Sequence, residues 1–149
     1  AGLSWITVLR KREGYRAAFA NFDYEAIADF SDRQLMDLRA DDRIIRNRLK
    51  IDSVRTNAIA FIETRQEFGS FSEFIWGFVN DRPIFNSWSE HESIPASTEL
   101  SERISKSLKK RGFKFVGSTI VYSLLQACGL VNDHVTSCFR YEECRAMAK

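Results

Sequence analysis

Basic side chains, glycines and aromatic rings are concentrated in one stretch of the chain, LKKRGFKFVG at residues 108–117. Five residues of the window from Lys106 to Lys114 are basic. Glycine at a turn lets the backbone approach a partner closely, and the first N–H groups of a helix that follows such a turn favour a phosphate. Lys110 and Arg111 would add positive charge there. The spacing alone slightly favours a simpler interpretation, in which the basic run is a solvated face beside a helix C-terminus.

The three cysteines of the chain are an odd set, and all of them lie in its last quarter. This pattern indicates a reducing compartment and a metal ligand rather than a disulfide framework. Cys128 falls on an apolar stretch with helical spacing and is interpreted as a core residue. We assign no role to Cys144.

Length and composition predict one globular domain over residues 1–149. Hydrophobic residues make up 44% of the chain and prolines number only two, which excludes a disordered protein. The formal net charge of +2 is too small to indicate nucleic-acid binding by itself, so such a role must come from local clustering. No apolar run reaches the ~18 residues of a membrane span and no signal peptide is visible, so we expect a cytoplasmic protein.

Helical periodicity dominates the sequence and predicts an all-α fold. The opening AGLSWITVLRKRE has a helical pattern with no capping residue ahead of it, so we expect that the chain begins inside an element. Gly14 is interpreted as a helix break, and capping boxes are expected at Ser31 and Ser70. No alternation is long enough for a strand, and residues 80–97 are expected to form a surface loop. The expected helices cover approximately residues 5–9, 15–22, 23–30, 31–40, 44–67, 71–79, 98–111 and 116–128.

The last two of these helices form a predicted hairpin over residues 98–128. Gly112 ends the first helix and Gly129 ends the second. The apolar residues expected to be buried are Leu100, Ile104 and Leu108 on the first helix and Ile120, Leu124 and Leu125 on the second.

Several motifs together resemble bacterial 3-methyladenine DNA glycosylase I, the Tag family of helix-hairpin-helix repair enzymes. They are KKRGFKFVG, QACGLVNDH with Cys138, the opening AGLSWITVL, and IIRNRLKIDSVRTNA and FIWGFVN between them. The resemblance covers residues 1–138. It implies an all-α monomer that flips 3-methyladenine out of damaged double-stranded DNA and hydrolyses its N-glycosidic bond without a lyase step.

The resemblance also implies which residues meet DNA. Trp5 matches the tryptophan that stacks on the flipped base, although read alone it would be a core residue. Phe113 and Phe115 are expected to pack the hairpin onto the core. No catalytic residue is assigned, because the family's pocket carboxylate is expected upstream of Ala1. The DNA-binding residues implied are Gly2 and Leu3, at the position of the family's wedge, and Lys110, Arg111, Gly112, Lys114, Gly117 and Ser118 of the hairpin.

A structural zinc ion is the cofactor that the resemblance implies. His134 and Cys138 match two of the family's four ligands, and the other two lie in a segment that precedes these 149 residues. Taken alone, a buried histidine and an inert cysteine would be the commoner reading of the pair. Asp133 would cap a helix or orient His134. We expect weak or no activity and impaired zinc binding from these 149 residues alone.

Two other functions stay open at this point. A non-catalytic helix-hairpin-helix module would bind DNA without excising a base. This alternative is favoured if the natural protein also lacks the segment with the pocket carboxylate and the other two zinc ligands. A helical scaffold without any nucleic-acid role would require the resemblance to be accidental.

Overall fold

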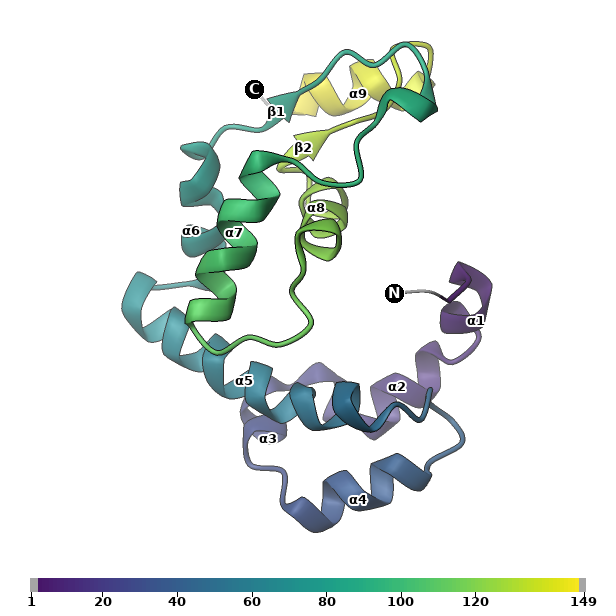
Figure 1. Cartoon of the computed structure of the whole chain (residues 1–149), viewed down its shortest axis with the longest axis vertical. Coiled ribbons are helices and arrows are strands. Elements are labelled where there is room, and N and C mark those ends of the chain that lie inside the picture. Colours follow the sequence, from purple (N-terminus) through teal and green to yellow (C-terminus); the bar gives the residue numbers. More distant parts are fainter. Residues whose placement is uncertain (1–2, 148–149) are drawn as a thin grey trace. The chain divides into compact units, whose positions relative to one another are not determined.

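The computed structural model describes residues 3–147. Its regular structure is helical apart from two strands of two residues each, which confirms the all-α prediction (Figure 1). The α-helices are α1 (Trp5–Leu9), α2 (Arg12–Ala18), α3 (Tyr24–Ala28), α4 (Asp32–Ala40), α5 (Arg48–Phe68), α6 (Phe71–Trp76), α7 (Glu99–Lys110), α8 (Ser118–Ala127) and α9 (Phe139–Met147). The 3-10 helices are η1 (Ala20–Phe22), η2 (Gly77–Val79) and η3 (His91–Ser93), and the strands are β1 (Ile84–Phe85) and β2 (Val131–Asn132).

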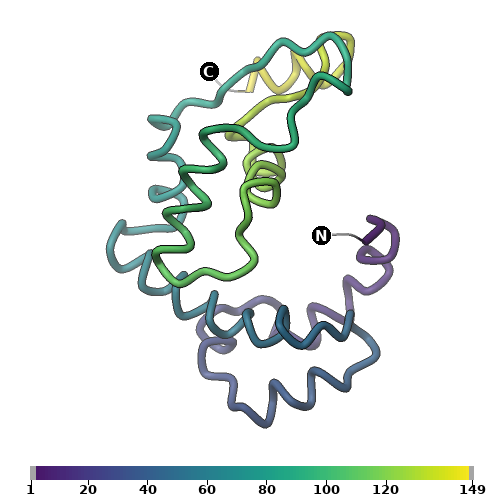
Figure 2. Tube along the Cα trace, in the orientation of Figure 1, coloured from purple at the N-terminus to yellow at the C-terminus, as the bar shows by residue number. Residues whose placement is uncertain are grey.

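The chain forms two compact units that do not follow the order of the sequence. One unit comprises Ala1–Glu67 together with Arg111–Phe115, and the other comprises Phe68–Lys110 together with Val116–Lys149. Residues 111–115 of the turn in the predicted hairpin therefore belong to the first unit, whereas both helices of the hairpin belong to the second. Figure 2 traces the chain from α7 through this turn into α8.

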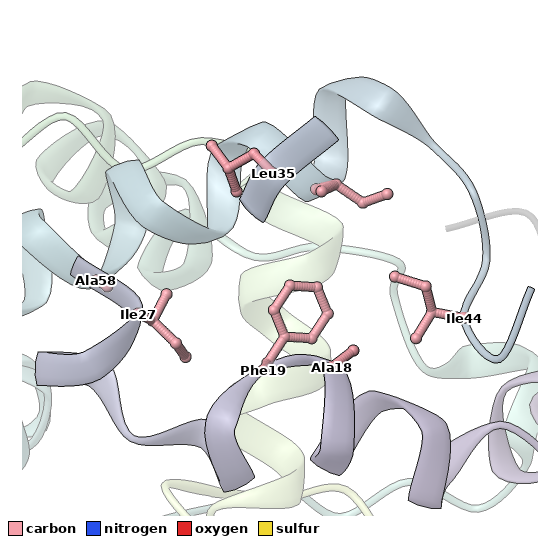
Figure 3. Close-up of a cluster of buried hydrophobic side chains, with 7 residues drawn as sticks. Ala18, Phe19, Ile27, Leu35, Ile44 and Ala58 are labelled. Carbon is pink, nitrogen blue, oxygen red and sulfur yellow. The ribbon is translucent and has the colours of Figure 1, made fainter. Parts of the chain in front are cut away.

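The core of the first unit gathers apolar side chains from α2 to α5 and from the connection before α5, whereas α1 contributes none (Figure 3). Phe19 is 3% exposed, and its ring is stacked 6.0 Å from that of Tyr15. Burying such side chains is the main force that holds short helices together, since helices of five to nine residues are not stable alone. The buried members are Ala18, Phe19, Ile27, Leu35, Ile44, Ile51 and Ala58.

Gly14 does not break a helix, contrary to our prediction. It lies inside α2, and a Cβ atom at this position would be 2.3 Å from the backbone oxygen of Arg43. The glycine is needed because another segment of the backbone comes close, and the break between α1 and α2 falls at Arg10 and Lys11 instead.

Short polar side chains begin several helices, and the capping box predicted at Ser31 is confirmed. At Ser31 the full capping box is present, with the Ser31 Oγ accepting from the Gln34 N–H and the Gln34 side chain accepting in return. α5 begins at Arg48, four residues later than expected, and the Asn47 side chain accepts from the Lys50 N–H. In the second unit, the Ser70 Oγ accepts from the Glu73 N–H at 2.9 Å, which is the forward half of the second predicted box.

In the second unit, α7 and α8 pack against each other. Ile104 and Leu108 of α7 are buried as predicted, whereas Leu100 is only partly buried. On α8 the prediction of Leu125 is confirmed, but Ile120 and Leu124 are 44% and 40% exposed. The buried face is instead formed by Val121, Tyr122 and Leu125.

The region expected to be an irregular surface loop contains β1, which pairs in parallel with β2 in the register Ile84 to Val131 and Phe85 to Asn132. Each strand has only two residues, so neither leaves an alternating pattern in the sequence. Helix α9 was also not predicted. Cys128 is exposed at the C-terminal end of α8, so its interpretation as a core residue is wrong. Among the described helices, none combines the length and the apolar character needed to cross a membrane.

Candidate functional site

The turn that joins α7 to α8 is formed by residues 111–117 and contains two glycines with different reasons to be there. Gly112 has φ +92°, a left-handed conformation that glycine adopts without steric cost. Gly117 has an ordinary φ of −62° at the N-terminal end of α8, and a Cβ atom there would meet no atom within 4 Å. The sequence prediction of a glycine turn between two helices is therefore correct.

Helix α5 holds the turn through two polar contacts within the first unit. The Arg111 guanidinium donates to both carboxylate oxygens of Glu67, with the Nη2 to Oε1 distance 3.0 Å. Hydrogen bonding to this guanidinium lowers the pKa of Glu67, and the same contact raises the pKa of Arg111. The Asn57 side chain accepts from the Lys114 N–H at 2.8 Å and donates to the Lys114 carbonyl at 3.2 Å.

The cations predicted to meet DNA differ in their surroundings. Lys110 and Lys114 are exposed, and within the described part of the chain neither side chain forms an ion pair. Arg111 is partly buried and its charge is already matched by Glu67. The two lysines thus present free positive charge to solvent, whereas the arginine also fastens the turn to α5.

The two phenylalanines of the turn do not share one role. Phe113 is 7% exposed and packs inward as predicted. Phe115 is 49% exposed, so the expectation that it packs onto the core is wrong. Its φ is +57°, and the Lys50 ammonium lies 5.9 Å from its ring centroid.

The N-terminal residues implied to meet the flipped base and the duplex lie at the start of α1. Ser4 caps this helix by accepting from the Thr7 N–H, so the expectation that the opening helix has no capping residue is wrong. Trp5 is 82% exposed and Leu3 is 50% exposed. Trp5 is therefore not a core residue of the described structure. Gly2 lies outside the described residues.

His134 and Cys138 come together as the resemblance implies. The Cys138 Sγ lies 3.7 Å from the His134 Nδ1. Tetrahedral zinc bonds of about 2.0–2.1 Å to nitrogen and about 2.3 Å to sulfur put those two atoms roughly 3.6 Å apart, so the pair fits one zinc ion. Within residues 3–147 no third His, Cys, Asp or Glu completes such a group.

A buried carboxylate directly precedes this pair. Asp133 is 8% exposed and accepts hydrogen bonds from four side chains. Burial raises the pKa of Asp133, but the four hydrogen bonds outweigh burial and leave it below its ordinary value. Burial and the bond to Asp133 raise the pKa of Tyr122. The donors are Asn86 Nδ2 at 2.7 Å, Trp88 Nε1 at 2.6 Å, Gln126 Nε2 at 2.8 Å and Tyr122 Oη at 2.5 Å.

The Asp133 network explains the geometry of the segment that carries His134 and Cys138. The carboxylate does not cap a helix, because every one of these four donors is a side chain. Trp88 also accepts from the Thr136 N–H at 2.8 Å, and Asn132 accepts from the His134 N–H at 3.1 Å. Among the described residues the Asp133 carboxylate makes no hydrogen bond to the His134 ring, so it holds the chain next to His134 rather than the ring itself. Sequence reasoning missed the network because Asn86 and Trp88 lie in a stretch without periodicity.

Comparisons with known proteins identify relatives of the whole described fold. The model of the family Methyladenine glycosylase matches residues 1–141. The chain is 50% identical over 141 residues to DNA-3-methyladenine glycosylase 1 of Escherichia coli (strain K12), covering 95% of this chain and 75% of that protein. It is 45% identical over 138 residues to DNA-3-methyladenine glycosylase of Haemophilus influenzae, covering 93% and 75%.

A solved structure agrees with these sequence comparisons. A variant of 3-methyladenine DNA glycosylase I in complex with 3-methyladenine superposes with a TM-score of 0.90 at 33% identity, covering 95% of this chain and 76% of that chain. Fold, family model and sequence identity therefore agree, and the chain belongs to the methyladenine glycosylase family.

Proposed function

We propose that this protein is a DNA base-excision repair glycosylase that removes 3-methyladenine from alkylated double-stranded DNA by hydrolysis. The observation that carries the proposal is the 50% identity to a protein named DNA-3-methyladenine glycosylase 1 over 95% of the chain. It is supported by the exposed side chains of Lys110 and Lys114 in the hairpin turn and by the exposed ring of Trp5.

The first step of the proposed reaction is recognition of the DNA backbone. Lys110 and Lys114 provide exposed cations for phosphate, and Gly117 leaves open space beside the first N–H groups of α8. These contacts carry no sequence information, which suits an enzyme that must search undamaged DNA. The helix-hairpin-helix region is thus assigned a backbone-binding role.

The second step is capture of the extruded base. Trp5 presents an 82% exposed aromatic ring, and such a face attracts a cationic purine. N3-methylated adenine carries a positive charge while it is attached to the sugar, so it is already a good leaving group. Water attacks the sugar C1′ atom, the bond from C1′ to N9 breaks, and its electrons neutralise the departing base while the proton of water passes to solvent. No covalent intermediate with a lysine is required.

The proposed protein also contains a structural zinc ion, which His134 and Cys138 would hold in part. Their 3.7 Å separation supports this assignment. When bound, such a closed site supplies a structural cross-link rather than a reacting group. Asn132 accepts from the His134 N–H, and Asp133 is held by Trp88. The backbone next to His134 is therefore held in place without the metal.

The test is release of free 3-methyladenine from methylated duplex DNA by the natural gene product that contains these 149 residues. We expect enzyme-dependent release of the base, measured by chromatography. A Trp5→Ala variant should release much less, while a Leu49→Ala variant, which removes an equally solvent-facing apolar side chain from α5, should match the parent. A folded protein that binds DNA and releases no base would contradict the proposal and favour the non-catalytic binding module.

A further inference from the structure

We propose that Asn57 of α5 is a positioning residue, which holds the hairpin turn in the conformation that meets the DNA backbone. The proposal rests on the DNA-binding role proposed above for the turn. Asn57 acts through Lys114, the exposed cation at the centre of the turn, rather than by contact with DNA.

The contact uses both ends of the asparagine amide on one residue. The Asn57 Oδ1 accepts from the Lys114 N–H at 2.8 Å, and the Asn57 Nδ2 donates to the Lys114 carbonyl at 3.2 Å. Two bonds to the two backbone groups of a single residue fix its orientation as well as its position. A side-chain amide has one donor group and one acceptor, whereas a carboxylate can only accept and alanine can do neither. Position 57 therefore needs a side chain that can donate and accept at once, which neither a carboxylate nor alanine can do.

The turn needs such support because Phe115, the residue after Lys114, is in an unfavourable backbone conformation. Phe115 has φ +57°, a left-handed region that bulky side chains rarely adopt. Conformations of this kind persist only where the surroundings hold them. Asn57 fixes the residue before Phe115, and Lys50 of the same helix lies over the Phe115 ring.

The other end of the turn has its own anchor in the Arg111 to Glu67 contact. Asn57 and Glu67 thus hold the turn at Lys114 and at Arg111, but only Asn57 acts next to the strained residue. Its contribution should be to the shape of the turn, because its side chain carries no charge. A pre-formed turn binds its partner more tightly because less conformational freedom is lost on binding.

This role has a signature that separates it from a direct phosphate contact. Removing a cation that touches phosphate lowers both the affinity and its dependence on salt. Removing a positioning residue lowers the affinity while every cation remains, so the salt dependence is kept. The Lys114 amide gives a second signature, because it should lose protection from hydrogen exchange when Asn57 is removed, without any DNA present.

The experiment compares Asn57→Ala with the parent chain by fluorescence anisotropy on an undamaged, fluorescein-labelled duplex over a salt series. We expect Asn57→Ala to bind roughly five-fold more weakly at each salt concentration, the factor of one net hydrogen bond, with an unchanged slope of log Kd against log salt. Lys114→Gln should instead reduce that slope by about one. Thr56→Ala, which alters the exposed neighbouring position of α5, is the matched control and should equal the parent.

Asn57→Asp provides the second arm. Its carboxylate can still accept from the Lys114 N–H but cannot donate to the carbonyl, so exchange protection should remain while DNA binding weakens at least as much as in Asn57→Ala. Circular dichroism confirms that each variant is folded.

Two outcomes overturn the proposal in different ways. If the parent binds the duplex and folded Asn57→Ala binds it equally well, or keeps the protection of the Lys114 amide, Asn57 does not position the turn. If the parent itself does not bind the duplex, the DNA-binding role of the turn fails and the proposal fails with it.

Discussion

The hairpin turn and the segment that carries His134 and Cys138 are both held by side-chain hydrogen bonds, but in opposite surroundings. The turn is fastened to α5 by exposed or partly exposed groups, chiefly Asn57 and Glu67. The segment with the proposed zinc ligands, residues 134–138 (the zinc-ligand segment), is fastened by the buried carboxylate of Asp133. An exposed hydrogen bond replaces one made to water and contributes little, whereas a buried donor that loses its partner is costly. The same device therefore adjusts a binding surface in one unit and maintains the fold in the other.

The largest effect should come from removing the buried acceptor. Asp133→Ala leaves the donors of Asn86, Trp88, Tyr122 and Gln126 without their shared partner, so we expect the free energy of unfolding to fall by about 3 kcal/mol or more. Urea unfolding followed by circular dichroism measures this. Asp81→Asn removes an exposed carboxylate charge from the same unit and should change stability by less than about 0.5 kcal/mol. Equal stability of the two variants would show that the network is not a determinant of the fold.

A pH dependence should distinguish the zinc-ligand segment from the turn. The pKa of Asp133 lies below its ordinary value of 3.8, so its stabilising contribution is present above that pH and is lost as the pH falls through the folded-state pKa. We expect the difference in stability between the parent and Asp133→Asn to be constant near neutral pH and to shrink below about pH 4. Urea midpoints over this range provide the measurement. A difference that persists undiminished in strong acid would mean that the charge of Asp133 is not what holds its donors.

Within the turn, a smaller effect should separate two neighbouring cations. Lys110→Gln removes an exposed charge that is unpaired within the described residues, so it should reduce the salt slope of DNA binding by about one without changing the unfolding midpoint. Arg111→Gln breaks the contact to Glu67, so it should lower the midpoint and change the salt slope less. Anisotropy and thermal unfolding test the two together. Identical behaviour of the two variants in both measurements would remove the distinction between a binding cation and a structural one.

The sequence predicts local structure well because caps and helix ends depend on near neighbours. The Ser31 capping box and the left-handed glycine at position 112 each involve residues within a few positions of one another. The prediction for Gly14 is wrong because the need for glycine there comes from Arg43, whose backbone approaches from another part of the chain.

The candidate site was predictable only where a family motif carried it. The spacing of His134 and Cys138 is visible in the sequence, and the two side chains are in contact in the structure. The glycine turn is also visible in the sequence, and the structure contains it. The partners that hold them are not visible, since Glu67 lies 44 residues from Arg111 and Trp88 lies 45 from Asp133. On α8 the buried face differs from the predicted one and includes Tyr122, whose hydroxyl donates to Asp133.

The smallest effect on stability should come from the two proposed metal ligands. His134 is exposed and Cys138 is only half-buried, whereas Asp133 and Asn132 beside them are buried and hydrogen-bonded. With metal removed by a chelator, His134→Ala should therefore change the free energy of unfolding of this chain by less than about 0.5 kcal/mol. Urea unfolding in the presence of the chelator, with Asp133→Ala as the matched opposite case, measures this. A loss comparable to that of Asp133→Ala would mean that the ligands hold the segment. The predicted small loss would mean that the fold places the ligands before the metal arrives, so zinc binding there loses less conformational entropy than at a segment that must first fold.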